Sequence, residues 1–130
     1  MDIRFRGKSV ESGEWLPGDL VHEAVNKHGY IVDVGIQQPY ELAVGVIPET
    51  VGMGTDFKDI KGVEVFTGDK VKAYKHGDLE GYKLTETITF RCGSFHFGNW
   101  NWTEFMRIFR YAEIVGNVHD EFMEVPNEKR

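Results

Sequence analysis

The sequence predicts a mainly β protein: a small SH3-like barrel, or a compact β-barrel or sandwich, with one short helix. Three observations lead to this fold class. Short apolar runs alternate with polar residues, which is the pattern of half-buried strands. Fifteen glycines interrupt those runs and favour tight turns. Aromatic residues make up 13% of the chain, and aromatic side chains are enriched in strands.

The chain length of 130 residues suits one folded domain with a core of its own. Apolar residues make up 41% of the chain and charged residues 28%, which are ordinary values for a globular protein. No compositionally biased linker divides the sequence. We therefore expect a single domain over residues 1–130, with an acidic tail at about residues 124–130.

Strand signals in the first half are short and bounded by turn residues. Ile3 and Phe5 alternate with arginines, as in a strand with one buried face. Pro17, Gly18 and Asp19 predict a turn between two strands. The predicted strands of this half cover residues 3–6, 15–16, 20–22, 30–34 and 41–47, with a hairpin loop at 26–29 and Pro48 as the final breaker.

The second half repeats this organisation. Thr67, Gly68 and Asp69 predict a turn that leads into a strand. Cys92 and Gly93 predict a two-residue hairpin turn. The predicted strands of this half cover residues 63–66, 71–74, 85–91, 94–97 and 113–118.

One helix is predicted over Thr103–Tyr111. Thr103 followed by Glu104 suits a helix N-terminus. The apolar face of this helix, at i, i+3, i+4 and i+7, consists of Phe105, Ile108, Phe109 and Ala112.

The pattern Gly-Asp-x-Val occurs twice, at residues 18–21 and 68–71. We interpret both copies as turns that open a strand, in which the carboxylates of Asp19 and Asp69 accept hydrogen bonds from nearby N–H groups. A catalytic role for either carboxylate is the alternative, and the turn interpretation is favoured.

The charge of the chain is unevenly distributed. The formal net charge is −6 and the isoelectric point about 5.3, which argues against a dedicated nucleic-acid binder. Residues 57–76 nevertheless hold five basic and three acidic side chains. This basic segment gives one candidate interaction surface, consisting of Lys70, Lys72, Tyr74 and Lys75. A solvated strand face is the simpler interpretation of the same residues.

Metal and cofactor motifs are incomplete. The histidines at 22, 28, 76, 96 and 119 do not lie at the spacing of a zinc site. His96 alternates with Phe95 and Phe97, so we expect it to face solvent from a strand. Residues 52–54 begin like a dinucleotide fingerprint, but Phe57 occupies the position of the third glycine, so we predict a loop there. We expect no metal ligands and no cofactor.

Nucleophile motifs are equally incomplete. Cys92 has only Arg91 as a local basic neighbour that could lower its pKa. The three serines, at positions 9, 12 and 94, lack the Gly-x-Ser-x-Gly elbow. The sequence therefore assigns no catalytic residue, and we expect the chain not to be an enzyme.

Two aromatic pairs have strand spacing, Trp100 with Trp102 and Phe95 with Phe97. Such pairs form stacking platforms for bases in some nucleic-acid binders. More often they belong to the core, because a domain of this size needs large apolar side chains inside.

The expected location is the cytoplasm. Cys92 is the one cysteine, so no internal disulfide forms. No run of apolar residues is long enough to span a membrane, and the first residues do not resemble a secretory signal.

Four blocks of the sequence resemble the YopX family of phage and prophage proteins. They are residues 3–8 with 13–20, residues 46–52, residues 58–71 and residues 113–120. The chain departs from the family pattern at residues 53–56 and 121–124. The resemblance implies a mainly β fold of SH3-like character and a phage or prophage origin, and it implies no established activity.

Two functions are consistent with these observations. The favoured one is a non-enzymatic accessory or protein-interaction module with a protein partner, a second copy of the chain being one option. The alternative is a nucleic-acid-binding small β-barrel that uses Lys70, Lys72, Tyr74 and Lys75. A nucleic-acid partner is less favoured because of the net charge, and we expect no contact with a membrane.

Overall fold

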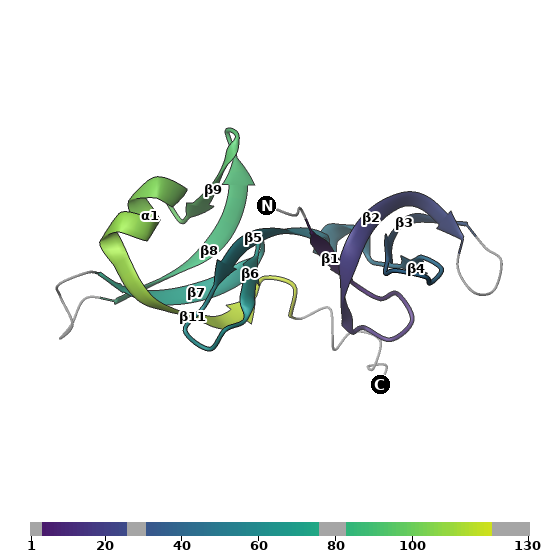
Figure 1. Cartoon of the computed structure of the whole chain (residues 1–130), viewed down its shortest axis with the longest axis horizontal. Helices are drawn as coiled ribbons and strands as arrows, with labels where there is room; N and C mark the ends of the chain where they lie inside the picture. Colours follow the sequence, from purple (N-terminus) through teal and green to yellow (C-terminus); the bar gives the residue numbers. More distant parts are fainter. Residues whose placement is uncertain (1–3, 26–30, 76–82, 121–130) are drawn as a thin grey trace. The chain divides into compact units, whose positions relative to one another are not determined.

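The computed structural model describes residues 4–25, 31–75 and 83–120 (Figure 1). These residues form eleven strands, one α-helix and one 3-10 helix. Every strand pairing recorded among them is antiparallel. The prediction of a mainly β fold with one short helix is confirmed. No helix in the described ranges is both long and apolar enough to cross a membrane.

The chain divides by its internal contacts into two compact units. Unit 1 contains Met1–Gly54 and His119–Arg130, and unit 2 contains Thr55–Val118. The single domain over residues 1–130 stays a prediction, because a domain is defined by cooperative unfolding as well as by compactness. The predicted acidic tail lies outside the described residues.

Unit 1 contains the first four strands of the chain and the start of β5, as far as Gly54, in the order β4-β3-β2-β1-β5. Their bounds are β1 Phe5–Lys8, β2 Trp15–Val25, β3 Ile31–Gln37, β4 Val44–Gly45 and β5 Gly52–Lys58, with a 3-10 helix at Pro48–Thr50. The predicted hairpin between β2 and β3 is confirmed by their pairing, whereas its loop at 26–29 lies outside the described residues. The loop predicted at residues 52–54 is wrong, because Gly52 and Met53 pair with β1 at the start of β5.

The chain after β4 bonds back to the end of β1. Val10 N donates to Gly45 O at 3.0 Å, and Ile47 N donates to Lys8 O at 2.9 Å. The core of unit 1 is small, because three buried side chains form its centre. They are Val34, Ile36 and Val46, with Phe5, Leu16, Leu20 and Val51 packed against them.

The turn predicted at Pro17, Gly18 and Asp19 is wrong, since all three residues lie inside β2. Gly18 has φ +156, and a Cβ atom on it would lie 2.6 Å from Gln37 O. Only glycine fits this close approach of β2 to β3. Asp19 lies in the same ladder, exposed and opposite Gln37, so it does not open a strand as its Gly-Asp motif predicted.

Unit 2 contains a five-stranded sheet in the order β10-β9-β8-β7-β11, and β6 beside β5. The bounds are β6 Glu64–Phe66, β7 Asp69–Lys75, β8 Lys83–Arg91, β9 Ser94–Phe97, β10 Trp100–Asn101, α1 Trp102–Ile108 and β11 Phe109–Asn117. The predicted hairpin turn between β8 and β9 is confirmed. Cys92 and Gly93 both have positive φ, 53° and 81°, as a type I′ turn requires.

The predicted helix exists but is shorter than Thr103–Tyr111, since α1 ends at Ile108. Asn101 caps its N-terminus in a capping box, where the Asn101 side chain accepts from Glu104 N at 2.9 Å. At the other end Phe109 turns into an extended conformation and pairs with Lys75 of β7. Strand pairing therefore ends the helix, and Ala112, predicted on its apolar face, is buried in β11 instead.

The core of unit 2 is aromatic. The ring of Phe97 lies 4.8 Å from Phe105 and 5.0 Å from Phe109, and Trp102 stacks on Phe105 at 4.9 Å. Trp100 is partly buried against the same cluster. The core interpretation of the two aromatic pairs fits these contacts better than an exposed stacking platform.

The prediction that His96 faces solvent is wrong. His96 is 9% exposed, and its Nδ1 lies 3.2 Å from Ser94 O. β9 lies between two strands, β8 and β10. His96 and Phe97, which point to opposite faces of the sheet, are both buried there, so alternation in β9 does not distinguish a solvent-exposed face from a buried one.

Candidate interaction surfaces

The predicted basic surface lies on β7, the strand between β8 and β11 (Figure 1). Lys70, Lys72 and Tyr74 are exposed or half-buried and alternate with three buried residues of the core face. The three therefore share the outer face of the sheet. Lys75 lies on the opposite side, since it stands across from Phe109, whose ring belongs to the core. The structure brings together three of the four predicted residues and separates the fourth.

The neighbouring strands extend this outer face. Tyr74 stands opposite Lys83 of β8 and Arg110 of β11, and directly opposed residues share a face. Lys83 Nζ lies 5.8 Å from the centre of the Tyr74 ring. The ring of Tyr111 meets that of Tyr74 edge to face at 6.5 Å. The name "β7 face" is used below for one set of residues: Lys70, Lys72, Tyr74, Lys83, Arg110 and Tyr111.

Sequence reasoning missed Lys83 and Tyr111. Both lie far from Lys70 in the sequence, and only the order of the strands makes them neighbours of Tyr74. Lys83 precedes the strand predicted at residues 85–91, and Tyr111 ends the predicted helix, so no local pattern would have found them.

One carboxylate also stands on this side of the sheet. Glu113 lies opposite Lys72, and its Oε2 is 3.0 Å from Lys61 Nζ. The hydrogen bond from Lys61 to Glu113 raises the pKa of that lysine, and their opposite charges act in the same direction. Because Glu113 already has Lys61 as a partner, it neutralises the lysines of the β7 face only in part.

Asp69 has the structural role predicted for it at the start of β7. Its side chain is 2% exposed. Oδ2 accepts from Phe66 N at 2.9 Å, and Oδ1 accepts from Asn117 Nδ2 at 3.0 Å. The carboxylate thus joins the turn before β7 to the end of β11.

Asp59 is a second buried anchor of unit 2. Its Oδ1 accepts from Lys61 N at 2.9 Å and Val63 N at 3.0 Å, and its Oδ2 accepts from Ile114 N at 3.1 Å. Burial alone would raise the pKa of Asp59. The backbone hydrogen bonds from Val63, Ile114 and Lys61, together with the charge of Lys61, outweigh burial and hold this pKa below its usual value.

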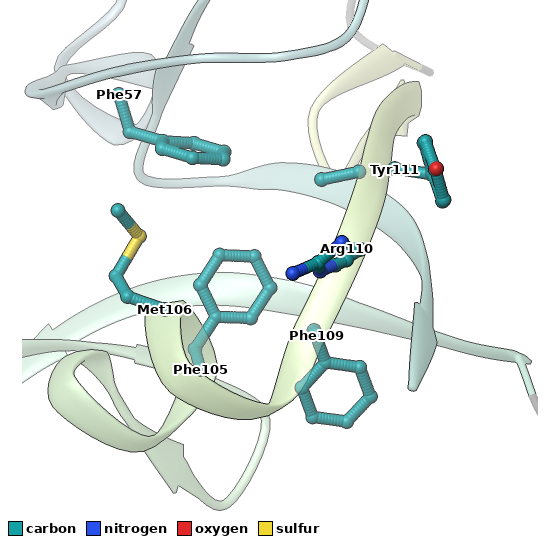
Figure 2. A pocket seen from close by; sticks show the side chains of 7 residues that line it. Phe57, Phe105, Met106, Phe109, Arg110 and Tyr111 are labelled. Atoms are coloured by element: carbon teal, nitrogen blue, oxygen red, sulfur yellow. The ribbon is translucent and has the colours of Figure 1, made fainter. Parts of the chain in front are cut away.

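An apolar pocket of about 290 Å³ lies between the end of α1 and β11 in unit 2. Figure 2 shows Phe57, Phe105 and Met106 on one side of the β11 ribbon and Tyr111 on the other, with Arg110 between them. Tyr111 borders both this pocket and the β7 face, since its ring also contacts that of Tyr74. The full lining of the pocket is Phe57, Phe105, Met106, Phe109, Arg110, Tyr111 and Ala112.

A second apolar surface lies at β4 in unit 1. It encloses a groove of about 310 Å³. Leu42 is 75% exposed, Val10 56% and Val44 39%. The groove, called the β4 groove below, is lined by Val10, Glu11, Val32, Leu42, Ala43, Val44 and Gly45.

Lys8 forms a buried basic site in unit 1. Its Nζ donates to His119 O at 2.7 Å and lies 5.1 Å from the Trp15 ring. Burial lowers the pKa of Lys8, an effect that the charge of Asp120 opposes. An amine with a lowered pKa suits catalysis, but a backbone carbonyl holds this one. Its role is to tie the chain at His119 to β1, and nothing in the sequence pattern indicated that Lys8 is buried.

Within the described ranges, no group of three or more His, Cys, Asp or Glu side chains is placed to hold a metal ion. Cys92 is a free, exposed thiol in its hairpin turn.

No protein-family model matches the chain, and no curated protein matches its sequence. Among solved structures, the crystal structure of protein EF1440 from Enterococcus faecalis is similar to it, with a TM-score of 0.53. The similarity covers 95% of this chain and 99% of that one at 17% sequence identity. At this identity the similarity shows a shared fold alone. Membership of the YopX family stays a prediction.

Proposed function

We propose that the chain is a non-enzymatic protein-interaction module whose β4 groove receives a basic segment of a partner protein with an apolar side chain at its centre. The observation that supports this most is the cluster of exposed apolar side chains, Val10, Leu42 and Val44, around one groove. Scattered exposed apolar residues are normal, whereas a cluster around a concavity is typical of a binding site.

The charge of unit 1 indicates the chemistry of the partner. The sequence ranges of unit 1 hold twelve acidic and six basic residues, so they account for the whole formal charge of −6. Glu11 adds a carboxylate to the lining of the groove itself. A segment with lysines or arginines around an apolar side chain is complementary to such a surface.

The non-enzymatic character is supported by what the buried ionisable groups do. Asp59 and Asp69 accept hydrogen bonds from main-chain and amide N–H groups, and Lys8 donates to a main-chain carbonyl. Each is held by the fold itself, as structural groups are.

We also propose, from the four blocks of resemblance, that the chain is a YopX-type phage or prophage protein with an SH3-like fold in the cytoplasm. The bonds from the chain after β4 back to β1 support the SH3-like part.

The test is selection from a random peptide library, followed by fluorescence anisotropy with the selected peptides. We expect peptides with an apolar residue between basic ones to be enriched and to bind saturably. Leu42→Ser removes an exposed side chain and leaves the core intact. It should weaken binding roughly tenfold or more, because burying a leucine is worth about 1.5–3 kcal/mol.

The matched control is Ile60→Ser, which removes an exposed apolar side chain, 60% accessible, from unit 2. It should bind the peptides as the unmodified protein does. The proposal is overturned if no peptide family is enriched, if the enriched peptides are acidic, or if Leu42→Ser and Ile60→Ser weaken binding equally.

A further inference from the structure

The charge balance of unit 2 differs from that of unit 1. Its sequence range holds nine basic and nine acidic residues, so unit 2 is formally neutral. On the β7 face, however, three lysines gather: Lys70, Lys72 and Lys83. The acidic residue beside them, Glu113, is paired with Lys61. The face is therefore positive on a neutral unit.

Tyr111 adds an aromatic surface to these cations. Its side chain is 51% exposed although tyrosine is largely apolar. Its φ is +55, in the left-handed region that non-glycine residues rarely adopt. The ladder of β11 with β7 shifts register between Arg110 and Glu113, and this irregularity places the Tyr111 ring against the edge of Tyr74. Irregular backbone that presents an aromatic ring to solvent is a feature of binding sites.

We propose that the β7 face binds single-stranded nucleic acid. The three lysines of the face and Arg110 would contact phosphates, and the exposed ring of Tyr111 would stack on a base. Alternate residues of a strand lie about 6.6 Å apart, so Lys70 and Lys72 present a row of positive charges along β7. A row of cations beside an aromatic ring is the general design of single-strand binding surfaces. This inference uses unit 2 alone and does not depend on the β4 groove.

Other anionic partners fit these residues less well. In a duplex the bases stack on each other, so the face of Tyr111 would find no unstacked base. An anionic membrane or an acidic protein would contact the lysines but would have no specific use for the exposed ring of Tyr111. That ring packs against Tyr74 where the ladder of β11 with β7 shifts register. Single-stranded nucleic acid uses both the charges and the ring.

The test is fluorescence anisotropy of the full chain with labelled single strands of about 12 nucleotides, their duplexes, and vesicles of anionic lipid. We expect saturable binding to single strands in low salt. With four phosphate contacts and a salt slope of about −0.7 per contact, the affinity should fall about 50-fold between roughly 50 and 200 mM salt. The variant Lys70→Ser/Lys72→Ser should bind more weakly and lose only about 7-fold over the same interval, because about two contacts remain, from Lys83 and Arg110.

The base-stacking role is tested with Tyr111→Asn, since asparagine tolerates the left-handed backbone of that position. Stacking is worth about 1–3 kcal/mol per base, so binding should weaken roughly 5- to 150-fold. Tyr40→Asn is the matched control, because Tyr40 is also exposed and has φ +64 but lies in unit 1. For the lysines the control is Lys58→Ser/Arg107→Ser, which removes two exposed charges from β5 and α1.

The result that supports the proposal is single-strand binding that both β7-face variants weaken and both controls leave unchanged. Absence of saturable binding at low salt overturns it. So does equal or tighter binding of duplex, binding confined to the vesicles, or equal weakening by the control variants. Circular dichroism of each variant shows whether it is folded, and Tyr111→Phe provides a second check because it keeps the ring and should retain binding.

Discussion

The carboxylate of Asp69 should stabilise unit 2 more than any exposed acidic residue of the chain. In Asp69→Ala, two buried donors, Phe66 N and Asn117 Nδ2, lose the acceptor that they meet at 2.9 and 3.0 Å. Each buried donor left without that acceptor costs about 1–3 kcal/mol. The expected loss in the free energy of unfolding is therefore about 2–6 kcal/mol, a large part of the stability of a small domain.

Asp19→Ala is the matched control, because Asp19 occupies the same position in the other Gly-Asp-x-Val sequence but is exposed. It should change the stability by about 0.5 kcal/mol or less. Asp69→Asn should give an intermediate loss of stability. Its amide oxygen can still accept one of the two hydrogen bonds, but its NH2 group then faces the other N–H donor. Urea unfolding, followed by tryptophan fluorescence, measures all three variants. Equal stability of Asp69→Ala and Asp19→Ala would refute the anchoring role. The role would also be refuted if Asp69→Ala lost binding to the selected peptides or to single strands while its stability stayed unchanged.

Two further predictions concern the backbone and the pH. Gly18→Ala should destabilise the protein by about 2–4 kcal/mol, because its backbone has φ +156 and its Cβ would lie 2.6 Å from Gln37 O. Gly13→Ala, with φ +75 and open space around it, should cost only the backbone strain of about 1–2 kcal/mol; equal melting temperatures would contradict this. Asp59 has a folded-state pKa below its unfolded value of 3.8, so its stabilisation is complete above that pH and is lost as the pH falls through the folded-state pKa. Urea midpoints of the unmodified protein and Asp59→Asn should therefore converge at acid pH, and a constant difference would contradict the hydrogen-bonding argument.

Local signals predicted the elements that depend on a few neighbouring residues. Cys92 and Gly93 form the hairpin turn that their sequence indicated, because two consecutive positive φ angles are a local requirement. The turn at Asp69 is also local, since its carboxylate accepts from Phe66, three residues earlier. Where the determining contact lies within about four residues, the sequence pattern was sufficient.

The errors lie where a distant strand decides the structure. The same Gly-Asp pair at Gly18 lies inside a strand, because β2 pairs with both β1 and β3 along its length. The apolar spacing predicted a helix as far as Tyr111. The helix nevertheless ends at Ile108, because Phe109 pairs with Lys75 and begins β11. Apolar spacing alone does not show which of these competing interactions is stronger.

The candidate surface shows the same division. Lys70, Lys72, Tyr74 and Lys75 were grouped because they belong to one basic segment of the sequence. The alternation of β7 places the first three on one side of the sheet and Lys75 on the other. Lys83 and Tyr111 could not be found, because they become neighbours of Tyr74 only through the order β8-β7-β11.

The β4 groove could not be predicted for the same reason. Val10 and Val44 line one groove because the chain around β4 bonds back to the end of β1.

The net charge of the whole chain is a poor guide to its nucleic-acid affinity. All six excess negative charges belong to the sequence ranges of unit 1, and unit 2 is neutral. At physiological ionic strength, charges farther than about 8 Å from a surface are largely screened. Within unit 2, a single strand that approaches the β7 face meets its three lysines, Arg110 and Glu113 first, and Lys61 partly neutralises Glu113. The isoelectric point of the whole chain therefore does not report the local charge of a face on unit 2.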